Sequence, residues 1–154
     1  MYQKMRRSDR ETTTAEAMKL LQNGEYGILS TVGTDGVPYG VPMNYATIGN
    51  TLYFHCAKGV GHRVDNLRGC KKVCFTVVGK TEVLPAKFST NYESVVVFGT
   101  AREAGEDKMR GLEAIIEKYA PDYKEAGQRY IREAIDKTSV IAVDIEFMTG
   151  KARK

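Results

Sequence analysis

Short runs in which apolar and polar residues alternate, the pattern of half-buried β-strands, recur along the chain. They are rich in Val, Ile, Tyr, Phe and Thr and cover residues 26–32, 37–45, 52–57, 72–78, 94–102 and 140–147. Asp35-Gly36, a strong hairpin signal, joins the first two runs. Pro38 and Pro42 lie on one side of the second run and cannot donate ladder hydrogen bonds, so we predict an edge strand or a bulge there.

Other stretches have the apolar spacing of helices. Four helices are predicted, at about 14–22, 61–69, 106–119 and 122–136. Thr12, Thr13 or Thr14 is a suitable N-cap for the first helix, and Gly24 ends it. Because strands and helices do not alternate, we expect a mainly β fold, a barrel with added helices. The length favours one domain over residues 1–154, with an N-terminal arm at 1–11 and a helical insertion at 106–136.

Composition narrows the class of protein. The 154 residues are 42% hydrophobic and 27% charged, which is ordinary for a globular domain. No apolar run approaches the roughly 18 residues of a membrane helix, and the three cysteines favour reduced thiols and a cytoplasmic location over a disulfide framework. The net charge of +4 is spread along the chain, so it suits an anionic ligand, and we expect neither nucleic acid nor a membrane as partner.

The segment from Lys58 to Arg63 is the first candidate for a ligand site. It has glycines at 59 and 61 and then opens a predicted helix with His62 and Arg63. A helix N-terminus offers free backbone N–H groups and the positive end of the helix dipole, so added cations make a phosphate pocket. A solvated basic first turn is the alternative, although acidic residues are the usual choice there.

The second candidate is His55, in the run 52–57. Its neighbours Phe54 and Cys56 point to the opposite face of the strand, so His55 faces either a satisfied packing partner or a planar ligand. Because His55 and Cys56 lie on opposite faces, and Cys70 and Cys74 lack a second ligand pair, we expect no metal site. A Cys56–His62 nucleophile pair is conceivable, but structural thiols are the better interpretation.

Six segments then follow one another in a specific order: EYGILST (25–31), DGVPYGVP (35–42), LYFHCA (52–57), GHRVDNL (61–67), VCF (73–75) and NYESVVVFG (91–99). Together they resemble the pyridoxamine 5′-phosphate oxidase-like split barrels, and most closely the 5-nitroimidazole resistance (Nim-like) subgroup. The resemblance covers roughly residues 5–151 and rests on the order and spacing of the segments.

The resemblance implies a six-stranded split β-barrel that forms a homodimer and binds FMN, or FAD, between the subunits. The cofactor-binding residues it implies, together with the phosphate pocket above, are Val41, Pro42, Met43, Asn44, His55, Lys58, His62, Arg63 and Ser94. The first four would follow the isoalloxazine ring. His55 would face the flavin as the catalytic residue, and Ser94 would reach it from the other subunit.

Three departures set limits on the activity. Val41 and Ala46 stand where the oxidase has Arg and Lys, and His62-Arg63 stands in place of its Arg-Lys phosphate pair. Phe147 replaces the histidine of the ending Ile-Glu-His-x-Thr-Gly-Lys. Oxidation of pyridoxamine phosphate is therefore not favoured. We expect an FMN-dependent, nitroreductase-like oxidoreductase that reduces small aromatic acceptors, nitroimidazole-type nitro groups among them, with NAD(P)H as donor. The alternative is a flavin-storing or flavin-sensing protein without turnover.

Overall fold

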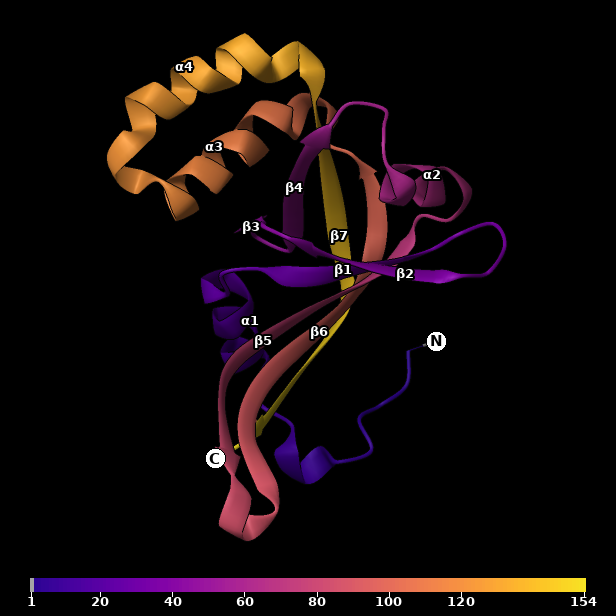
Figure 1. Cartoon of the computed structure of the whole chain (residues 1–154), viewed down its shortest axis with the longest axis vertical. Coiled ribbons are helices and arrows are strands. Elements are labelled where there is room, and N and C mark those ends of the chain that lie inside the picture. Colours follow the sequence, from indigo (N-terminus) through magenta and orange to yellow (C-terminus); the bar gives the residue numbers. More distant parts are fainter. Residues whose placement is uncertain (1) are drawn as a thin grey trace.

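The computed structural model describes residues 2–154, so Met1, the first residue of the predicted arm, lies outside it. One antiparallel sheet curls into a half-barrel with the strand order β2-β1-β5-β6-β7-β4-β3 (Figure 1). Its strands are β1 (Gly27–Val32), β2 (Pro38–Met43), β3 (Ala46–Ile48), β4 (Thr51–Ala57), β5 (Lys72–Leu84), β6 (Ser89–Glu103) and β7 (Thr138–Arg153). The mainly β barrel is confirmed. It has seven strands, rather than six, because 46–48 pairs with β4 as a strand of its own.

Residues 2–154 also form four α-helices, which lie around the sheet (Figure 1). They are α1 (Thr14–Asn23), α2 (His62–Gly69), α3 (Lys108–Tyr119) and α4 (Lys124–Ala134), with short 3-10 turns at Ser8–Arg10, Pro85–Lys87, Gly105–Asp107, Pro121–Tyr123 and Ile135–Lys137. Thr13 caps α1: its side chain accepts from Glu16 N, and the Glu16 side chain accepts from Thr13 N, which completes a capping box. No helix among residues 2–154 is both long and apolar enough to cross a membrane.

Two apolar clusters hold the sheet and helices together. Inside the barrel, the Phe75 ring meets Tyr45 and Phe54 edge-on, at centroid distances of 4.8 and 5.1 Å, and Leu21 of α1 is fully buried beside them. A second cluster lies under the α3–α4 pair, on the other face of β4 and β7. It comprises Tyr53, Ala104, Leu112, Ile131, Val140 and Ala142. The two faces of β4 are therefore packed against different parts of the molecule.

β2 is an edge strand, as its prolines predict. It pairs with β1 and with no other strand of the sheet in residues 2–154. Gly36 has φ +79° in the β1–β2 turn, a conformation that glycine adopts without strain. Val37 breaks the expected alternation, because it belongs to the turn and is 53% exposed.

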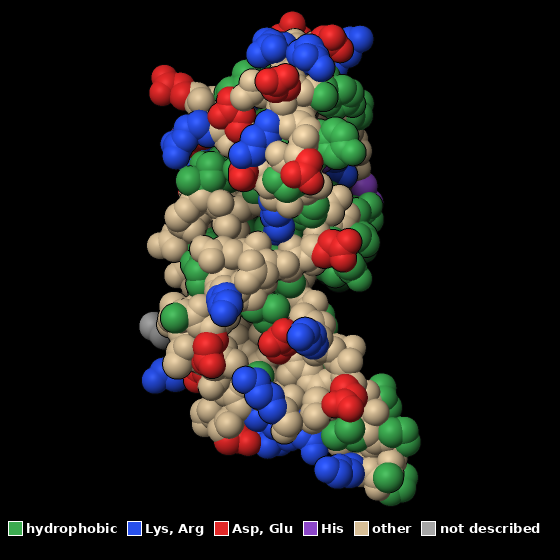
Figure 2. All heavy atoms as spheres, turned by 90° about the vertical axis from the view of Figure 1, so that its left-hand side faces the viewer, with side chains coloured by type: hydrophobic (Ala, Val, Ile, Leu, Met, Phe, Trp, Pro, Cys, Tyr) green, Lys and Arg blue, Asp and Glu red, His purple; other side chains and the backbone are tan. Residues whose placement is uncertain are grey.

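The β5–β6 hairpin is longer than its apolar pattern predicts. A register shift between Val78 and Thr81 marks where the two strands leave the barrel and continue as a projecting arm. The tip of this arm is apolar and open: Val83 is 69% and Phe88 98% exposed. Figure 2 shows these green side chains at the lower end of the molecule.

Candidate functional site at the start of α2

The backbone at the start of α2 is shaped by Gly61. This residue is the N-cap with φ +113°, a value that side-chain-bearing residues rarely adopt, and it supplies no side-chain acceptor. Its carbonyl receives the backbone N–H groups of Val64 and Asp65, at 2.9 and 3.2 Å. The N–H groups ahead of these two have no acceptor within the helix, so they are available to an anion.

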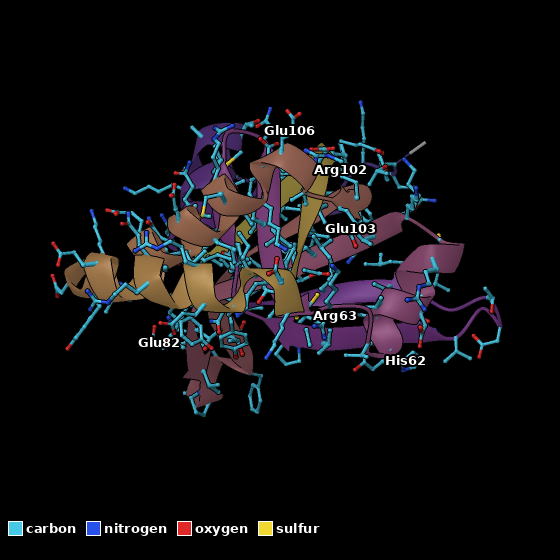
Figure 3. All side chains as sticks on the ribbon, turned by 90° about the horizontal axis from the view of Figure 1, so that it is seen from above. His62, Arg63, Glu82, Arg102, Glu103 and Glu106 are labelled. Carbon is cyan, nitrogen blue, oxygen red and sulfur yellow. The ribbon has the colours of Figure 1, made fainter. Side chains whose placement is uncertain are left out.

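The first two side chains of α2, His62 and Arg63, lie near two different strands, β2 and β4. The His62 ring stacks on Tyr39 of β2 with centroids 4.2 Å apart. Arg63 is close enough to β4 for its charge to help lower the pKa of His55. β2 has a free edge, and beyond its pairing with β3 at Thr51–Tyr53, β4 has one too. We call Tyr39, His55, His62 and Arg63 the edge site; Figure 3 labels its two α2 residues.

The Arg63 side chain has an unsatisfied hydrogen-bond donor within residues 2–154. Its Nε is buried and has no partner among residues 2–154. A buried donor on a charged group is costly to leave unsatisfied, and a guanidinium matches carboxylate or phosphate oxygens better than any neutral acceptor. A phosphate at the start of α2 would meet that need and the helix N–H groups together. The residues present therefore fit the phosphate of a flavin nucleotide.

His55 points away from the barrel core, as its alternation predicts. Phe54 and Cys56 are buried on the inner face, and His55 is exposed on the other. His55 is exposed by surface area, yet protein atoms around the imidazole desolvate it in part and lower its pKa, and the positive charge of Arg63 lowers the pKa further. The imidazole is thus neutral at pH 7, with one nitrogen to donate and one to accept a hydrogen bond.

The predicted ring-contacting stretch of β2 is divided between core and surface. Met43 is buried in the barrel and Val41 packs against the same cluster. Pro42 and Asn44 are exposed, and the Asn44 side chain donates to Glu25 O at 3.1 Å. Pro42 and Asn44 are therefore the side chains of this stretch most open to contact from outside.

Two of the predicted cofactor-binding residues, Lys58 and Ser94, line cavities outside the edge site. Lys58 lines a cavity of about 510 Å³ between α2 and the ends of β4, β6 and β7. Ser94 lines a cavity of about 320 Å³ next to α1 and Lys151. His62 and Arg63 are neighbours on α2, and the charge of Arg63 acts on His55. Ser94 is far from them, because it pairs with Lys151 near one end of β7 whereas His55 pairs with Val140 near the other. A role for Lys58 at a phosphate stays a prediction.

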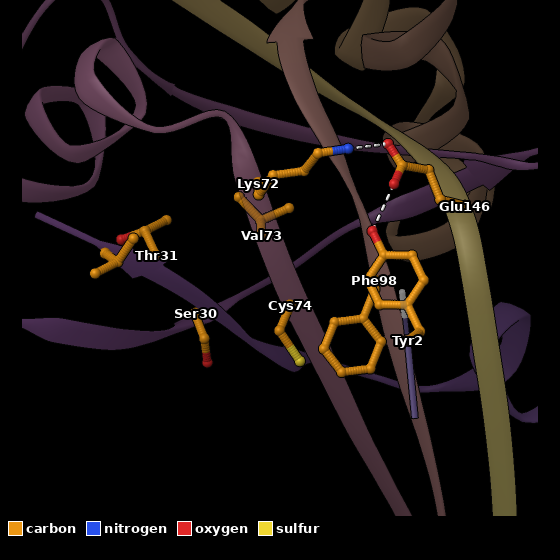
Figure 4. A pocket seen from close by; sticks show the side chains of 9 residues that line it. Tyr2, Ser30, Thr31, Lys72, Val73, Cys74, Phe98 and Glu146 are labelled. Carbon is orange, nitrogen blue, oxygen red and sulfur yellow. Dashed lines mark hydrogen bonds and ion pairs between the residues drawn. The ribbon is translucent and has the colours of Figure 1, made fainter. Parts of the chain in front are cut away.

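Sequence reasoning missed an aromatic cluster on the outer face of the sheet (Figure 4). The Tyr2 ring stacks on Phe98 and Phe147 at centroid distances of 4.9 and 5.4 Å. Its hydroxyl donates to Glu146 at 2.5 Å, and Lys72 Nζ reaches the same carboxylate at 2.6 Å. A cavity of about 590 Å³ lies beside this cluster. No local signal predicts it, because the three rings come from distant parts of the chain.

A second missed group ties α3 to the start of β3. Tyr119 accepts a hydrogen bond from Tyr45 N at 3.1 Å and donates to Glu25 O at 2.6 Å. The neighbouring Lys118 places its ammonium over the Tyr45 ring, 3.7 Å from the centroid. The helical insertion is therefore fastened by polar contacts as well as by its apolar face.

The curled antiparallel sheet with its added helices has the architecture of a split-barrel protein. The sequence pattern of the pyridoxamine 5′-phosphate oxidase family matches residues 13–152, and the chain belongs to that family. No curated protein matches the sequence closely enough to count as a relative.

Solved structures share the fold over most of the chain. A candidate 5-nitroimidazole antibiotic resistance protein from Bacteroides thetaiotaomicron is 23% identical, with a TM-score of 0.73 over 91% of this chain and 84% of the other. A flavocytochrome from Azotobacter vinelandii is 20% identical (TM-score 0.81, 98% and 72%). An FAD and heme binding protein from Mycobacterium smegmatis is 22% identical (TM-score 0.80, 94% and 74%).

Proposed function

We propose that this protein is a flavin-dependent oxidoreductase. It would bind FMN and reduce small aromatic acceptors, nitroimidazole-type nitro groups among them, with a reduced nicotinamide as donor. The observation that carries the proposal is the buried Arg63 Nε at the N-terminus of α2, which has no hydrogen-bond partner in the described part of the chain. Family membership and the flavin-binding and nitroimidazole-resistance descriptions of the structural neighbours support it.

The phosphate would be held by Arg63, by His62 and by the first N–H groups of α2. The isoalloxazine ring would follow the free edge of β2 at Val41–Asn44, where Pro42 and Asn44 are exposed. When bound there, a flavin would supply the hydride and electron transfer between a reduced nicotinamide and the acceptor. The protein supplies the position and the electrostatic environment of the ring.

His55 would act on the acceptor by hydrogen bonding or proton donation. The charge of Arg63 helps keep its pKa low in the free protein. A phosphate dianion at Arg63 would neutralise that charge, so ligand binding raises the pKa of His55 toward its ordinary value. Desolvation still lowers the pKa of His55 in the bound state, but the imidazole would be protonated more readily there than in the free protein.

Two subunits would complete the site. Ser94 lies outside the edge site of its own chain, so a contact with flavin would come from Ser94 of the partner subunit. The outer face of β1, β5 and β6 would offer the surface for a homodimer, since Ile28 and Val96 are only partly buried there and Val78 is 59% exposed.

The test is flavin binding by the Arg63→Gln variant. Wild-type protein should show flavin absorption bands, and the variant should bind FMN roughly 10–100-fold more weakly, as expected for loss of a charge-assisted hydrogen bond. Arg68→Gln is the matched control, because Arg68 is on the same helix, exposed, and paired with Asp65 at 3.0 Å. Equal affinity in both variants, or a wild-type protein that takes up neither FMN nor FAD, would overturn the proposal.

Measurement of NAD(P)H consumption distinguishes an oxidoreductase from a protein that only stores or senses flavin. NAD(P)H consumption with nitroaromatic or quinone acceptors should depend on bound flavin and should fall in His55→Ala while flavin stays bound. Unchanged turnover in His55→Ala would remove the role of His55. Tight flavin binding without any NAD(P)H consumption would favour the storage or sensing function.

A further inference from the structure

The cavity lined by Lys58 opens at the end of the barrel, on the inner side of β4. Its volume is about 510 Å³, within the range of roughly 300–1,000 Å³ typical of small-molecule sites. Cys56, Ala101 and Ile141 form a buried apolar floor, and Val64 and Leu67 of α2 close one wall. His55 lies on the opposite face of β4 from Cys56, so this cavity and the edge site are different places.

The rim of the cavity is cationic. Lys58, Lys71, Arg68 and Arg102 line it, against one acidic residue, Glu103. Arg102 is committed to Asp144, with nitrogen–oxygen distances of 2.7 and 3.2 Å, and Arg68 is paired with Asp65. The ammonium groups of Lys58 and Lys71 form no ion pair or hydrogen bond within residues 2–154.

We propose that this cavity binds a small amphipathic carboxylate. An apolar ring or short acyl chain would lie on the floor formed by Cys56, Ala101 and Ile141, and the carboxylate would meet Lys58 and Lys71 at the rim. An apolar cavity with a few convergent polar groups is the usual form of such a site. The inference goes beyond the proposed function, because it needs no flavin and no electron transfer.

Cys56 provides the readout, because its thiol lines the cavity floor. Cys70 and Cys74 are the other free thiols, and Cys74 lines a different cavity. In a Cys70→Ser/Cys74→Ser background, alkylation by N-ethylmaleimide therefore reports on Cys56 alone. Octanoate serves as probe, with octylammonium, octanol and octyl phosphate as comparisons.

Octanoate should slow the alkylation of Cys56 several-fold, while octylammonium should not. Lys58→Gln/Lys71→Gln should weaken octanoate binding roughly tenfold, equivalent to about 1.4 kcal/mol. Lys80→Gln/Lys87→Gln, which removes the same charge from the projecting hairpin, is the matched control and should bind octanoate like the parent. Octyl phosphate should bind less tightly if the site selects carboxylates.

Four results would overturn the proposal. Equal protection by octanol or octylammonium would show a site without selectivity for anions. Equal weakening in both lysine double variants would show a general charge effect. Preference for octyl phosphate would replace the carboxylate with a phosphate ligand. Protection of Cys56 by FMN itself would show that the cavity is part of the flavin site.

Discussion

Two cationic groups are buried without a hydrogen-bond partner within residues 2–154, and their surroundings differ. Arg63 Nε sits at an open helix N-terminus, where a phosphate would satisfy it. Lys118 Nζ instead lies against the face of the Tyr45 ring. The aromatic face offsets only part of the cost of burying an ammonium. The surroundings of Arg63 therefore indicate a ligand site, whereas the burial of Lys118 lowers the free energy of unfolding.

Lys118→Met should stabilise the protein at neutral pH. Burial lowers the pKa of Lys118 to about 8, below the roughly 10.4 of an unfolded lysine. Between these values the unfolded chain binds more protons, so the wild-type free energy of unfolding rises with pH across that window. The gain in Lys118→Met should be roughly 1 kcal/mol at pH 7, after discounting for solvent screening and the Tyr45 contact.

Urea denaturation at pH 7 and above pH 10 measures this difference. The gain should shrink as pH rises through the window and disappear once Lys118 is neutral in both states. Lys19→Met, at an exposed position of α1, is the control and should change stability little at either pH. A Lys118→Met variant that is less stable at pH 7 would show that the ring contact outweighs the burial.

At the scale of elements, boundaries with their own local signal could be predicted. Asp35-Gly36 gave the β1–β2 turn, and Gly61 the start of α2. The outer parts of β5 and β6 could not be predicted, because beyond Val78 neither face meets the core and the apolar alternation stops. In the projecting part of the β5–β6 hairpin, each strand is stabilised by pairing with the other, and the apolar pattern of one segment carries no information about that pairing.

Thr13→Ala tests the capping box of α1. The change removes the side-chain acceptor for Glu16 N, and Glu16 loses its hydrogen bond from the Thr13 hydroxyl. The expected loss is about 1 kcal/mol in the free energy of unfolding, measured by urea denaturation. Thr14→Ala, one position into the helix, is the control and should cost much less. Equal losses in the two variants would contradict a capping role for Thr13.

At the scale of the whole molecule, only some of the contacts within the candidate site could be predicted from the sequence. His62 and Arg63 are neighbours, so their shared place was predictable. The approach of Arg63 to His55 and of His62 to Tyr39 depends on where α2 lies relative to β2 and β4. The distance of Ser94 from these residues depends on the pairing of β6 and β4 with opposite ends of β7, which no local spacing encodes.

The N-terminal arm should detach from the sheet in acid. Hydrogen bonds from Lys72, Thr100 and Tyr2 lower the pKa of Glu146 to about 2, below the roughly 4.3 of an unfolded glutamate. The stabilisation from the ionised carboxylate is therefore complete above the unfolded pKa and is lost as pH falls toward 2. Glu146→Gln should release the arm already at neutral pH.

NMR signals of the Tyr2 ring report on this contact, since stacking on Phe98 and Phe147 shifts them. They should move toward free-tyrosine positions as pH falls in the wild type and at pH 7 in Glu146→Gln. Glu106→Gln, an exposed change outside the cluster, should leave them in place. A Tyr2 ring that stays stacked in Glu146→Gln would show that the aromatic contacts alone hold the arm.

The position of β7 in the sheet has a consequence for biosynthesis. β7 lies between β6 and β4, so it joins the β2-β1-β5-β6 layer to the β4-β3 hairpin. Of the strands described, it is also the last to leave the ribosome. Until β7 has been synthesised, the β2-β1-β5-β6 layer and the β4-β3 hairpin of the nascent chain are not joined and have unpaired strand edges. We expect the nascent chain to be most prone to aggregation, and most dependent on chaperones, during that interval.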